Sequence, residues 1–384
     1  MIRPKFEVGH VVNQFWDSFN KKYSSNSYTL RTLYALLVCR TSALGYHKER
    51  CDSCTNIRIS YNSCRNRHCP KCQAAKQVIW VEDTSERIID TKYFHVVFTL
   101  PHELNEICLL DSKSFYNTLF ASSWNTLQTF GYTHYGVESG ALAMLHTWDQ
   151  KLGLHPHIHC LVPSAGLSLD GKFKRITKKG KYLHNVEMMS KAFRDNMLKR
   201  LKKQLHKKDI IIKYQPIIDK AWAKKWNVFC EPSFSDAEHV IKYLGQYTHR
   251  VAISNHRILS IDNDSVRFVY KDSNDNRKDK PITFTGVEFL RRFCMHILPK
   301  GFVKIRYYGI MSSRFAKRTI LLSKRTSNRP KEKESVHERL KRLTGFDILL
   351  CPFCKKGRMH TIEVMPRIRS PDKRHRLKAN QLSV

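Results

Sequence analysis

The sequence predicts an α+β protein with an N-terminal zinc-binding module, a following antiparallel sheet with flanking helices, and a basic C-terminal tail. Two Cys-x-x-Cys pairs lie close together near the N-terminus. Short apolar runs of strand length recur after them, and longer segments with helical periodicity separate these runs. We expect three regions: 8–100 with N-terminal helices and the zinc module, 101–320 with the sheet, and 321–384 with the tail.

The charge of the chain indicates a polyanionic partner. Lys and Arg number 68 against 33 Asp and Glu, which gives a net charge of +35 over 384 residues. Solubility needs far less, so nucleic acid is the natural counterpart. A membrane is not favoured, because no apolar run approaches the roughly 18 residues of a spanning helix. The N-terminus lacks the features of a secretory signal, so we expect a reducing cytoplasm in which the 12 cysteines are thiols or metal ligands.

Cysteine pairs follow a helical N-terminal segment. Residues 10–45 carry apolar side chains at three-to-four spacing, which indicates a packing helix pair without chemistry of its own. Cys51 and Cys54 are then followed by Cys69 and Cys72, and two such pairs at this spacing are typical of one tetrahedral structural zinc. A redox role is the alternative for each pair.

Further candidate ligands leave the zinc set open. Cys64, His68 and His47 lie in the same stretch, so the ligand set could be permuted or a second zinc could bind. From Ser312 onward the chain reads as basic and irregular, and its last fifteen or so residues look disordered. The exception is the lone pair of Cys351 and Cys354, which has no visible partner pair.

Three alternate histidines stand in an apolar run at 154–162, which reads as a buried strand. Because strand side chains alternate, His157 and His159 share a face and form half of a divalent-metal site. His155 falls on the same face, at the rim. A histidine-rich strand that only packs is the alternative reading. Residues 141–148 predict a second strand, joined through a turn at 149–153, and this hairpin would bring His146 or Gln150 close as a third ligand.

A helix opening with a capping box at 235–238 carries Tyr243 and Tyr247 one turn apart, on a common face. Two tyrosines at this spacing are usually only core. A strand at 226–231, ended by Pro232, precedes the helix, and a strand at 302–310 follows later in the chain. That later strand is rich in aromatic and positive residues, which suits single-stranded nucleic acid.

Basic side chains near these motifs are the expected DNA contacts. The runs within 171–208 are either solvated helix faces or phosphate-tracking surfaces. The individual contacts we expect are Arg65, Arg67, Lys71, Arg250, Lys304 and Arg306.

The combination resembles the HUH-type rolling-circle transposases of bacterial insertion sequences, in the two-tyrosine group with an N-terminal zinc-binding domain. The resemblance spans nearly the whole chain and rests on four strings: YNSCRNRHCPKCQ at 61–73, LGLHPHIHCLVP at 152–163, YLGQYTHRVAIS at 243–254, and LPKGFVKIRYYG at 298–309. The family's histidine–hydrophobic–histidine motif falls on 157–159. Its paired nucleophiles fall on Tyr243 and Tyr247. Tyr307 stands where we expect histidine in relatives.

The resemblance implies an HUH-endonuclease-like antiparallel sheet with the histidines on a central strand. It also implies structural Zn²⁺ and a catalytic Mg²⁺ or Mn²⁺ on the histidines. A tyrosine would become joined to a 5′ phosphate of single-stranded DNA, leaving a free 3′ hydroxyl, and the protein would work at the bacterial nucleoid.

Three other functions fit part of the sequence. A relaxase or replication initiator would use the same chemistry on another substrate. A non-catalytic, zinc-organised DNA-binding protein would explain the charge and the cysteines, but neither the histidine strand nor the tyrosine helix. A metal-dependent hydrolase would use activated water and leave no protein–DNA adduct.

Overall fold

A computed structural model describes residues 4–85, 88–89, 91–176, 185–234, 245, 251–315 and 334–367. The chain divides into two compact units. Unit 1 comprises 1–79, 249–297 and 331–384, and unit 2 comprises 80–248 and 298–330. Each unit is therefore assembled from segments far apart in the sequence. No helix in the described ranges is long and apolar enough to cross a membrane.

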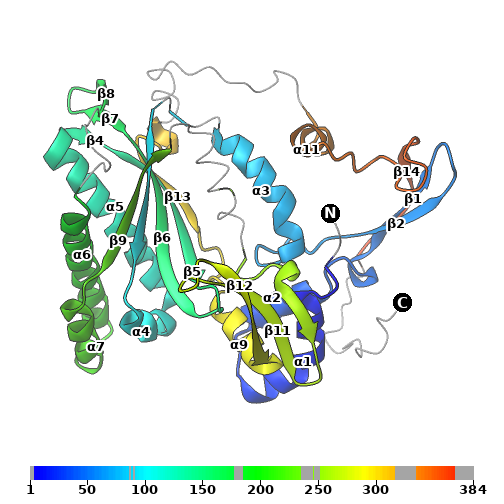
Figure 1. Ribbon diagram of the computed structural model, residues 1–384, viewed down its shortest axis with the longest axis horizontal. Coiled ribbons are helices and arrows are strands. Elements are labelled where there is room, and N and C mark those ends of the chain that lie inside the picture. The colour runs from blue at the N-terminus through cyan, green and yellow to red at the C-terminus, as the bar shows by residue number, and fades with distance from the viewer. Residues whose placement is uncertain are drawn as a thin grey trace. The chain divides into compact units, whose positions relative to one another are not determined.

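Unit 2 is built on a five-stranded antiparallel sheet (Figure 1). Its strands run in the order β13 (Ile305–Gly309), β5 (Gly140–Trp148), β6 (Leu154–Pro163), β3 (Tyr93–Thr99) and β9 (Asn227–Phe234). The strand that bears the histidines, β6, is the third of the five, which confirms the central position expected for it. Three short strands form a separate sheet: β4 (Val137–Glu138), β7 (Ala165–Ser168) and β8 (Phe173–Arg175).

Helices cover one face of the five-stranded sheet (Figure 1). They are α4 (Asn105–Leu110), α5 (Ser112–Tyr135), α6 (Val186–Lys207) and α7 (Ile211–Ala223). From β6, this face receives Ile158, Cys160 and Val162, each at most 1% exposed. Because side chains alternate along a strand, burial of these three directs His157 and His159 to the opposite face.

The hairpin between β5 and β6 fixes which residues lie opposite each other. His146 pairs with His157 and Met144 pairs with His159. In the turn, the backbone N–H groups of Lys151 and Gly153 donate to Asp149 Oδ1 at 2.8 and 2.6 Å. Glycine at position 153 leaves room for the Asp149 carboxylate, which a Cβ there would overlap. The expected hairpin is therefore confirmed.

Unit 1 contains the expected N-terminal helix pair, α1 (Val8–Lys22) and α2 (Ser27–Leu37), whose apolar side chains are buried together. Helix α9 (Gly286–Met295) packs against α1. One sheet comprises β10 (Ile258–Ile261), β11 (Ser265–Asp272) and β12 (Lys278–Thr285). The other sheet of unit 1 has its strands in the order β14 (Met359–Met365), β1 (Tyr46–Cys51) and β2 (Ile57–Tyr61). Helix α3 (Pro70–Ser85) leads out of unit 1 into unit 2.

Two expectations about secondary structure need correction. The segment after residue 312 was expected to be irregular, but it contains α11 (Val336–Thr344) and β14, which pairs with β1. Residues 368–384 lie outside the described ranges. Pro232 was expected to end its strand, but β9 continues to Phe234. A proline is tolerated there because β9 is an edge strand and its pairing with β3 has an irregularity at this point.

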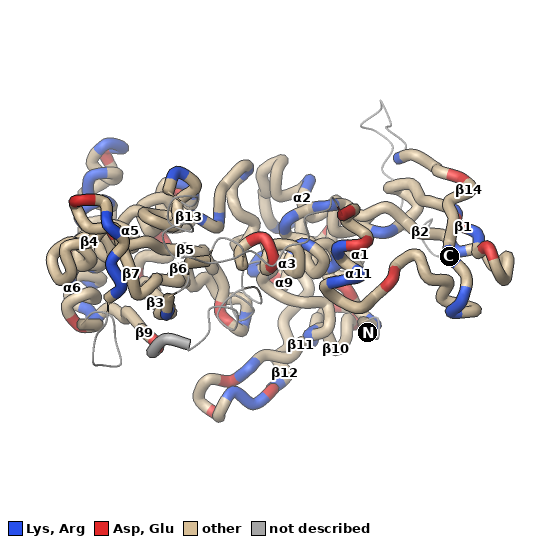
Figure 2. The backbone as a smooth tube through the Cα atoms, turned by 90° about the horizontal axis from the view of Figure 1, so that it is seen from above, with Lys and Arg blue, Asp and Glu red and all other residues tan. Residues whose placement is uncertain are grey.

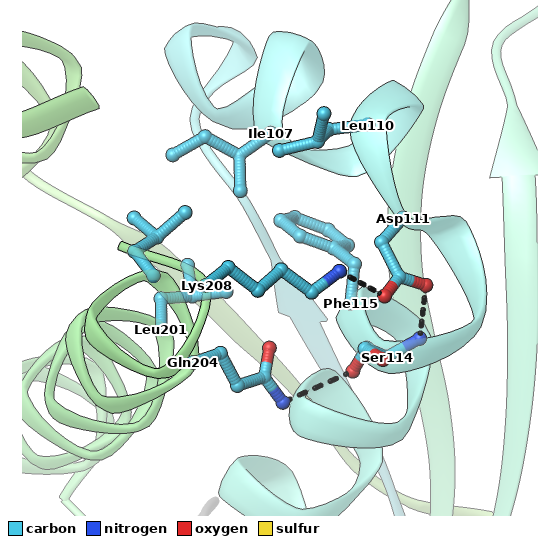
Figure 3. Close-up of a pocket in the computed structure, with 9 residues that line it drawn as sticks. Ile107, Leu110, Asp111, Ser114, Phe115, Leu201, Gln204 and Lys208 are labelled. Atoms are coloured by element: carbon cyan, nitrogen blue, oxygen red, sulfur yellow. Dashed lines mark hydrogen bonds and ion pairs between the residues drawn. The ribbon is translucent and has the colours of Figure 1, made fainter. Parts of the chain in front are cut away.

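A small pocket lies among α4, α5 and α6, remote from the histidine face (Figure 3). Its walls are mainly apolar, and Asp111 and Lys208 pair across its rim at 2.5 Å. Asp111 also caps α5, since its Oδ1 accepts the Ser114 N–H at 3.1 Å. Burial alone would raise the pKa of Asp111, but the hydrogen bonds from Lys208 and Ser114 outweigh it and lower the pKa below its usual value.

Replacing Asp111 by alanine is expected to destabilise the protein by about 1 kcal/mol at pH 7, the usual worth of a helix cap. The folded-state pKa of Asp111 is lowered, so its contribution is present above the unfolded pKa of about 4 and is lost as the pH falls through the folded value. Urea unfolding of wild type and Asp111→Ala at pH 7 and pH 3 measures both effects. Asp195→Ala, which removes a half-exposed ion pair on α6, is the control and should change stability by less than about 0.5 kcal/mol. An equal effect of the two substitutions would contradict the capping role.

Candidate metal centres and nucleic-acid contacts

Three histidine rings meet on the face of the central hairpin opposite the helices α4 to α7. His146 comes from β5, and His157 and His159 come from β6. Their nearest ring nitrogens all lie within 4.8 Å of one another. Ring centroids are 4.5 Å apart for His146 and His159, 4.9 Å for His157 and His159, and 5.3 Å for His146 and His157. The cluster includes His146, the histidine that the sequence offered as a third ligand.

Hydrogen bonds orient two of these rings. Nδ1 of His157 bonds to the backbone carbonyl of His155 at 2.7 Å. Nδ1 of His159 bonds to Nε2 of His95 on β3 at 2.8 Å, and the two rings are stacked. In both rings Nδ1 is therefore engaged, and Nε2 is the nitrogen that would coordinate a metal.

Burial keeps the rings of His157 and His159 neutral. Burial lowers the pKa of His157 to about 4, and the hydrogen bond to His155 only partly offsets it. Burial, together with the neighbouring histidines, lowers the pKa of His159 well below its usual value. Neutral imidazole is the form that donates a lone pair to a metal. Three imidazoles within one small triangle, two of them held neutral by burial, therefore fit a divalent ion, and first-row transition ions suit them better than Mg²⁺ does.

The two tyrosines and Arg250 lie outside the described residues. Gly245, between Tyr243 and Tyr247, is described and helical. It lies against Val81 of α3, so closely that a Cβ at 245 would overlap the valine side chain. Val81 in turn packs against an apolar cluster that includes Met144 and Leu161, two residues on the histidine face of the sheet.

Four cysteines of unit 1 form a first sulfur cluster: Cys39, Cys64, Cys69 and Cys72. Sγ of Cys39 is 3.6 Å from Sγ of Cys72 and 3.6 Å from Sγ of Cys69, and Cys64 is 3.6 Å from Cys72. A tetrahedral zinc with Zn–S bonds of about 2.3 Å separates its sulfurs by about 3.8 Å. The donor set therefore fits Zn²⁺, and the backbone N–H of Cys64 also donates to Cys39 Sγ at 3.4 Å.

The grouping of Cys51 and Cys54 with Cys69 and Cys72 around one ion was wrong. The structure places Cys51 and Cys54 in a second cluster with Cys351 and Cys354. Cys64, one of the further candidates, joins the first cluster, whereas His47 and His68 belong to neither cluster. Sequence reasoning missed Cys39, because it stands alone just after α2, in no Cys-x-x-Cys pair.

The expected DNA contacts differ in their surroundings. Arg65 is exposed, and its backbone is held in the left-handed region at φ 55°. Lys71 is engaged inside unit 1, where its ammonium donates to Glu7 at 2.6 Å and to the Cys39 carbonyl at 2.7 Å. Burial lowers the pKa of Arg67, which is half-buried.

In unit 2, Arg306 lies over the Phe120 ring and donates to Asn117 at 2.5 Å. These contacts are on the helix-covered face of the sheet, opposite the histidines. Lys304 precedes β13, and its carbonyl accepts the Leu145 N–H at 2.9 Å. Lys and Arg recur along elements of both units (Figure 2), so the positive charge is not confined to the positions singled out from the sequence.

Tyr307, where a histidine was expected, lies on the histidine face at β13. Its hydroxyl is 3.4 Å from the Thr84 hydroxyl, and its ring packs with the apolar cluster of Leu142 and Leu161. It is not among the three clustered histidines and has an evident packing role.

Comparisons with known proteins agree with this geometry. Residues 140–319 match the family model described as "Putative transposase", and residues 11–100 match "Transposase zinc-binding domain". The chain is 36% identical over 395 residues to "Putative transposase y4qJ" of Sinorhizobium fredii, a match that covers 97% of this chain and 98% of that protein. It is 26% identical over 313 residues to "Transposase for insertion sequence element IS801" of Pseudomonas savastanoi pv. phaseolicola, covering 79% and 75% of the two chains. No solved structure gives a significant match.

These matches confirm the resemblance drawn from the sequence motifs and extend over almost the full length of a relative. They also account for the first thiolate cluster, which falls within the matched zinc-binding domain and supports structural Zn²⁺. The chain belongs to the IS91-type family of insertion-sequence transposases with an N-terminal zinc-binding domain, enzymes that act on DNA.

Proposed function

We propose that this transposase cuts and rejoins single-stranded DNA through a 5′-phosphotyrosine intermediate, as in rolling-circle transposition. The observation that carries the proposal is the triangle of His146, His157 and His159 on one face of the central hairpin. Three clustered imidazoles fit a divalent cation, and the cysteines of unit 1 form separate clusters with sulfur as the donor.

The three histidines would hold Mn²⁺ or Mg²⁺. The ion, when bound, supplies Lewis-acid polarisation of the scissile phosphate and offsets charge that develops during the reaction. The protein's own part is to hold the rings rigidly, through the β5–β6 register and through the Nδ1 hydrogen bonds of His157 and His159. Because nitrogen donors favour transition ions, we expect Mn²⁺ to support more activity than Mg²⁺ at equal concentration.

Tyr243 and Tyr247 are the proposed nucleophiles. Gly245 stands two residues from each of them and lies against Val81, which packs with side chains of the histidine face. In the cleavage step a tyrosine oxygen attacks phosphorus, losing its proton, and the bond from phosphorus to the 3′ oxygen breaks. The departing oxygen takes up a proton and becomes a free 3′ hydroxyl. The energy of the broken bond is kept in the phosphotyrosine, so rejoining to another 3′ hydroxyl needs no ATP.

Two tyrosines would permit two successive cleavages within one active site, one at each element end. Single-stranded DNA is the proposed substrate, because the strand must be unpaired for its phosphate to reach a metal held by these histidines. Exposed basic residues such as Arg65, together with Arg250 and Lys304, are the proposed phosphate contacts.

The test uses single-stranded DNA of the element's own end sequence, labelled on the 3′ side of the cut. The full-length protein is incubated with Mn²⁺, Mg²⁺ or EDTA, and the products are separated on denaturing gels. The variants are Tyr243→Phe, Tyr247→Phe, the double tyrosine variant and His157→Ala. His155→Ala is the matched control, since this neighbour shares the strand face but not the cluster. We expect label to migrate with the protein in the presence of metal, and the double tyrosine variant to lose all of it. We expect His157→Ala to reduce adduct at least 100-fold, and His155→Ala less than 10-fold.

Other outcomes would overturn the proposal. Metal-dependent cleavage without a protein–DNA adduct would show a hydrolase that uses water. Tight binding of DNA with neither cleavage nor adduct would show a protein without this chemistry. Adduct that persists in the double tyrosine variant would show that another residue is the nucleophile.

A further inference from the structure

We infer a second structural zinc site, formed by Cys51 and Cys54 together with Cys351 and Cys354. All four sulfurs lie within 4.8 Å of one another. Sγ of Cys51 is 3.7 Å from Sγ of Cys354, and Sγ of Cys54 is 3.7 Å from Sγ of Cys351. These separations match the roughly 3.8 Å between sulfurs on a tetrahedral zinc and are far from the roughly 2.05 Å of a disulfide.

The two Cys-x-x-Cys segments have the same local geometry. Each is followed by a residue in the left-handed region, Thr55 at φ 59° and Lys355 at φ 57°. In each, the N–H of that residue donates to the carbonyl of the first cysteine, at 3.2 Å for Cys51 and 3.0 Å for Cys351. This shared turn presents two sulfurs from each segment to a common point.

Backbone N–H groups support the sulfurs as they would support thiolates. The N–H of Ser53 donates to Cys51 Sγ at 3.4 Å, and the N–H of Gly357 donates to Cys354 Sγ at 3.3 Å. Gly357 lies close to the cluster, since a Cβ there would be 2.5 Å from Cys51 Sγ and would force a side chain to shift. Such donors stabilise negative charge on sulfur, which is the form that binds zinc.

The surrounding sheet aligns the two segments. Cys51 is the last residue of β1 and lies opposite Met359, the first residue of β14. Asp52 Oδ1 accepts the Arg358 N–H at 2.8 Å, and Cys51, Cys351 and Met359 are buried together. The register of β1 with β14 and the four sulfurs therefore specify the same pairing.

Only the N-terminal half of this site, Cys51 and Cys54, lies within a matched family model. The zinc-binding match ends at residue 100 and the transposase match ends at residue 319, so Cys351 and Cys354 fall outside both. Zinc at this position would fasten a C-terminal segment to the N-terminal module across about 300 residues of chain. Cys351 and Cys354 thus pair with Cys51 and Cys54, which the sequence spacing had grouped with Cys69 and Cys72.

Zinc content of the purified full-length protein, measured by mass spectrometry, tests the pairing. We expect two zinc ions per wild-type chain. Replacing Cys51 and Cys54 by serine should leave one, replacing Cys351 and Cys354 should leave one, and replacing all four should still leave one. Replacing Cys39 and Cys64 should also leave one. Cys294→Ser, outside both clusters, should leave two.

The four-serine variant distinguishes one shared site from two separate sites, even if a pair variant loses its ion because it is less stable. Loss of both ions in that variant, with one lost in each pair variant, would place the pairs in different sites and overturn the inference. Two ions retained after removal of Cys351 and Cys354 would overturn it as well. Substitution by Co²⁺ gives a second readout, because tetrahedral thiolate coordination produces visible absorption that should halve in each pair variant.

A different observation carries a second inference, which rests on the proposed function. The structure assigns His95 and Glu231 as positioning residues for His159. His95 Nε2 is 2.8 Å from His159 Nδ1, and His95 Nδ1 is 3.2 Å from Glu231 Oε2 on β9. His95 is only 3% exposed, so its ring is fixed by packing as well.

The hydrogen bonds from Glu231 through His95 to His159 determine which ring nitrogen of each histidine donates and which accepts. A carboxylate only accepts, so His95 donates from Nδ1 to Glu231 and its Nε2 must then accept. His159 therefore donates from Nδ1 and presents the lone pair of Nε2 toward the cluster. Partners of this kind orient metal-binding histidines, and their loss typically weakens metal binding 10–100-fold.

Mn²⁺ binding, followed by the electron paramagnetic resonance signal of free Mn²⁺, tests this assignment without relying on activity. We expect Glu231→Ala and His95→Ala to weaken Mn²⁺ binding about 10-fold or more. Glu231→Gln should recover most of the affinity, because the amide oxygen still accepts from His95. Phe229→Ala, on the same strand and face, is the control and should bind like wild type.

The outcomes distinguish failure of the positioning role from failure of the metal site. Wild-type affinity in His95→Ala and Glu231→Ala, with His157→Ala impaired, would overturn the positioning role and leave the proposed metal site intact. Absence of Mn²⁺ binding in wild type would overturn the metal site and the positioning role together.

Discussion

The register between β5 and β6 is the constraint on which the histidine site depends. Ile158, Cys160 and Val162 must face the helices to complete the main core of unit 2, and alternation then leaves His157 and His159 no other face. A slip of one residue would bury the imidazoles among phenylalanines and expose the core side chains. The free energy that drives core formation therefore also brings the histidines together on one face.

The same reasoning explains how much the sequence could predict. Strand period, the turn at 149–153 and the alternation of histidines are local features, so the hairpin and the face shared by His157 and His159 followed from them, and the expectation held. His146 could be offered as a neighbour but not placed, because hairpin register depends on the turn, and Asp149 and Gly153 define it through side-chain contacts. His95 and Glu231 gave no signal, since each comes from a different strand and only sheet order brings them together.

The cysteine clusters show where local spacing misleads. Cys51, Cys54, Cys69 and Cys72 are near in sequence and have the right ligand chemistry, yet they divide between two clusters. Cys39 joins one cluster from a helix end, and the other takes its second half from residues about 300 positions away. Spacing identifies a pair that can chelate one edge of a tetrahedron, but the partner pair is chosen by tertiary structure. The β1–β14 pairing, which was absent from the expected tail, makes that choice.

The two kinds of cluster differ in the coordination they leave open, and this difference fits their separate roles. Four thiolates saturate a tetrahedral zinc, so such an ion can brace a fold but has no position for a phosphate. Three imidazoles do not complete the coordination of a divalent ion, so a metal held there would have positions for oxygen ligands of a substrate. Sulfur also selects zinc strongly, whereas imidazole accepts a wider range of divalent ions. Sorting sulfur into unit 1 and imidazole into unit 2 therefore keeps the structural ion from competing for the site where DNA would be cut.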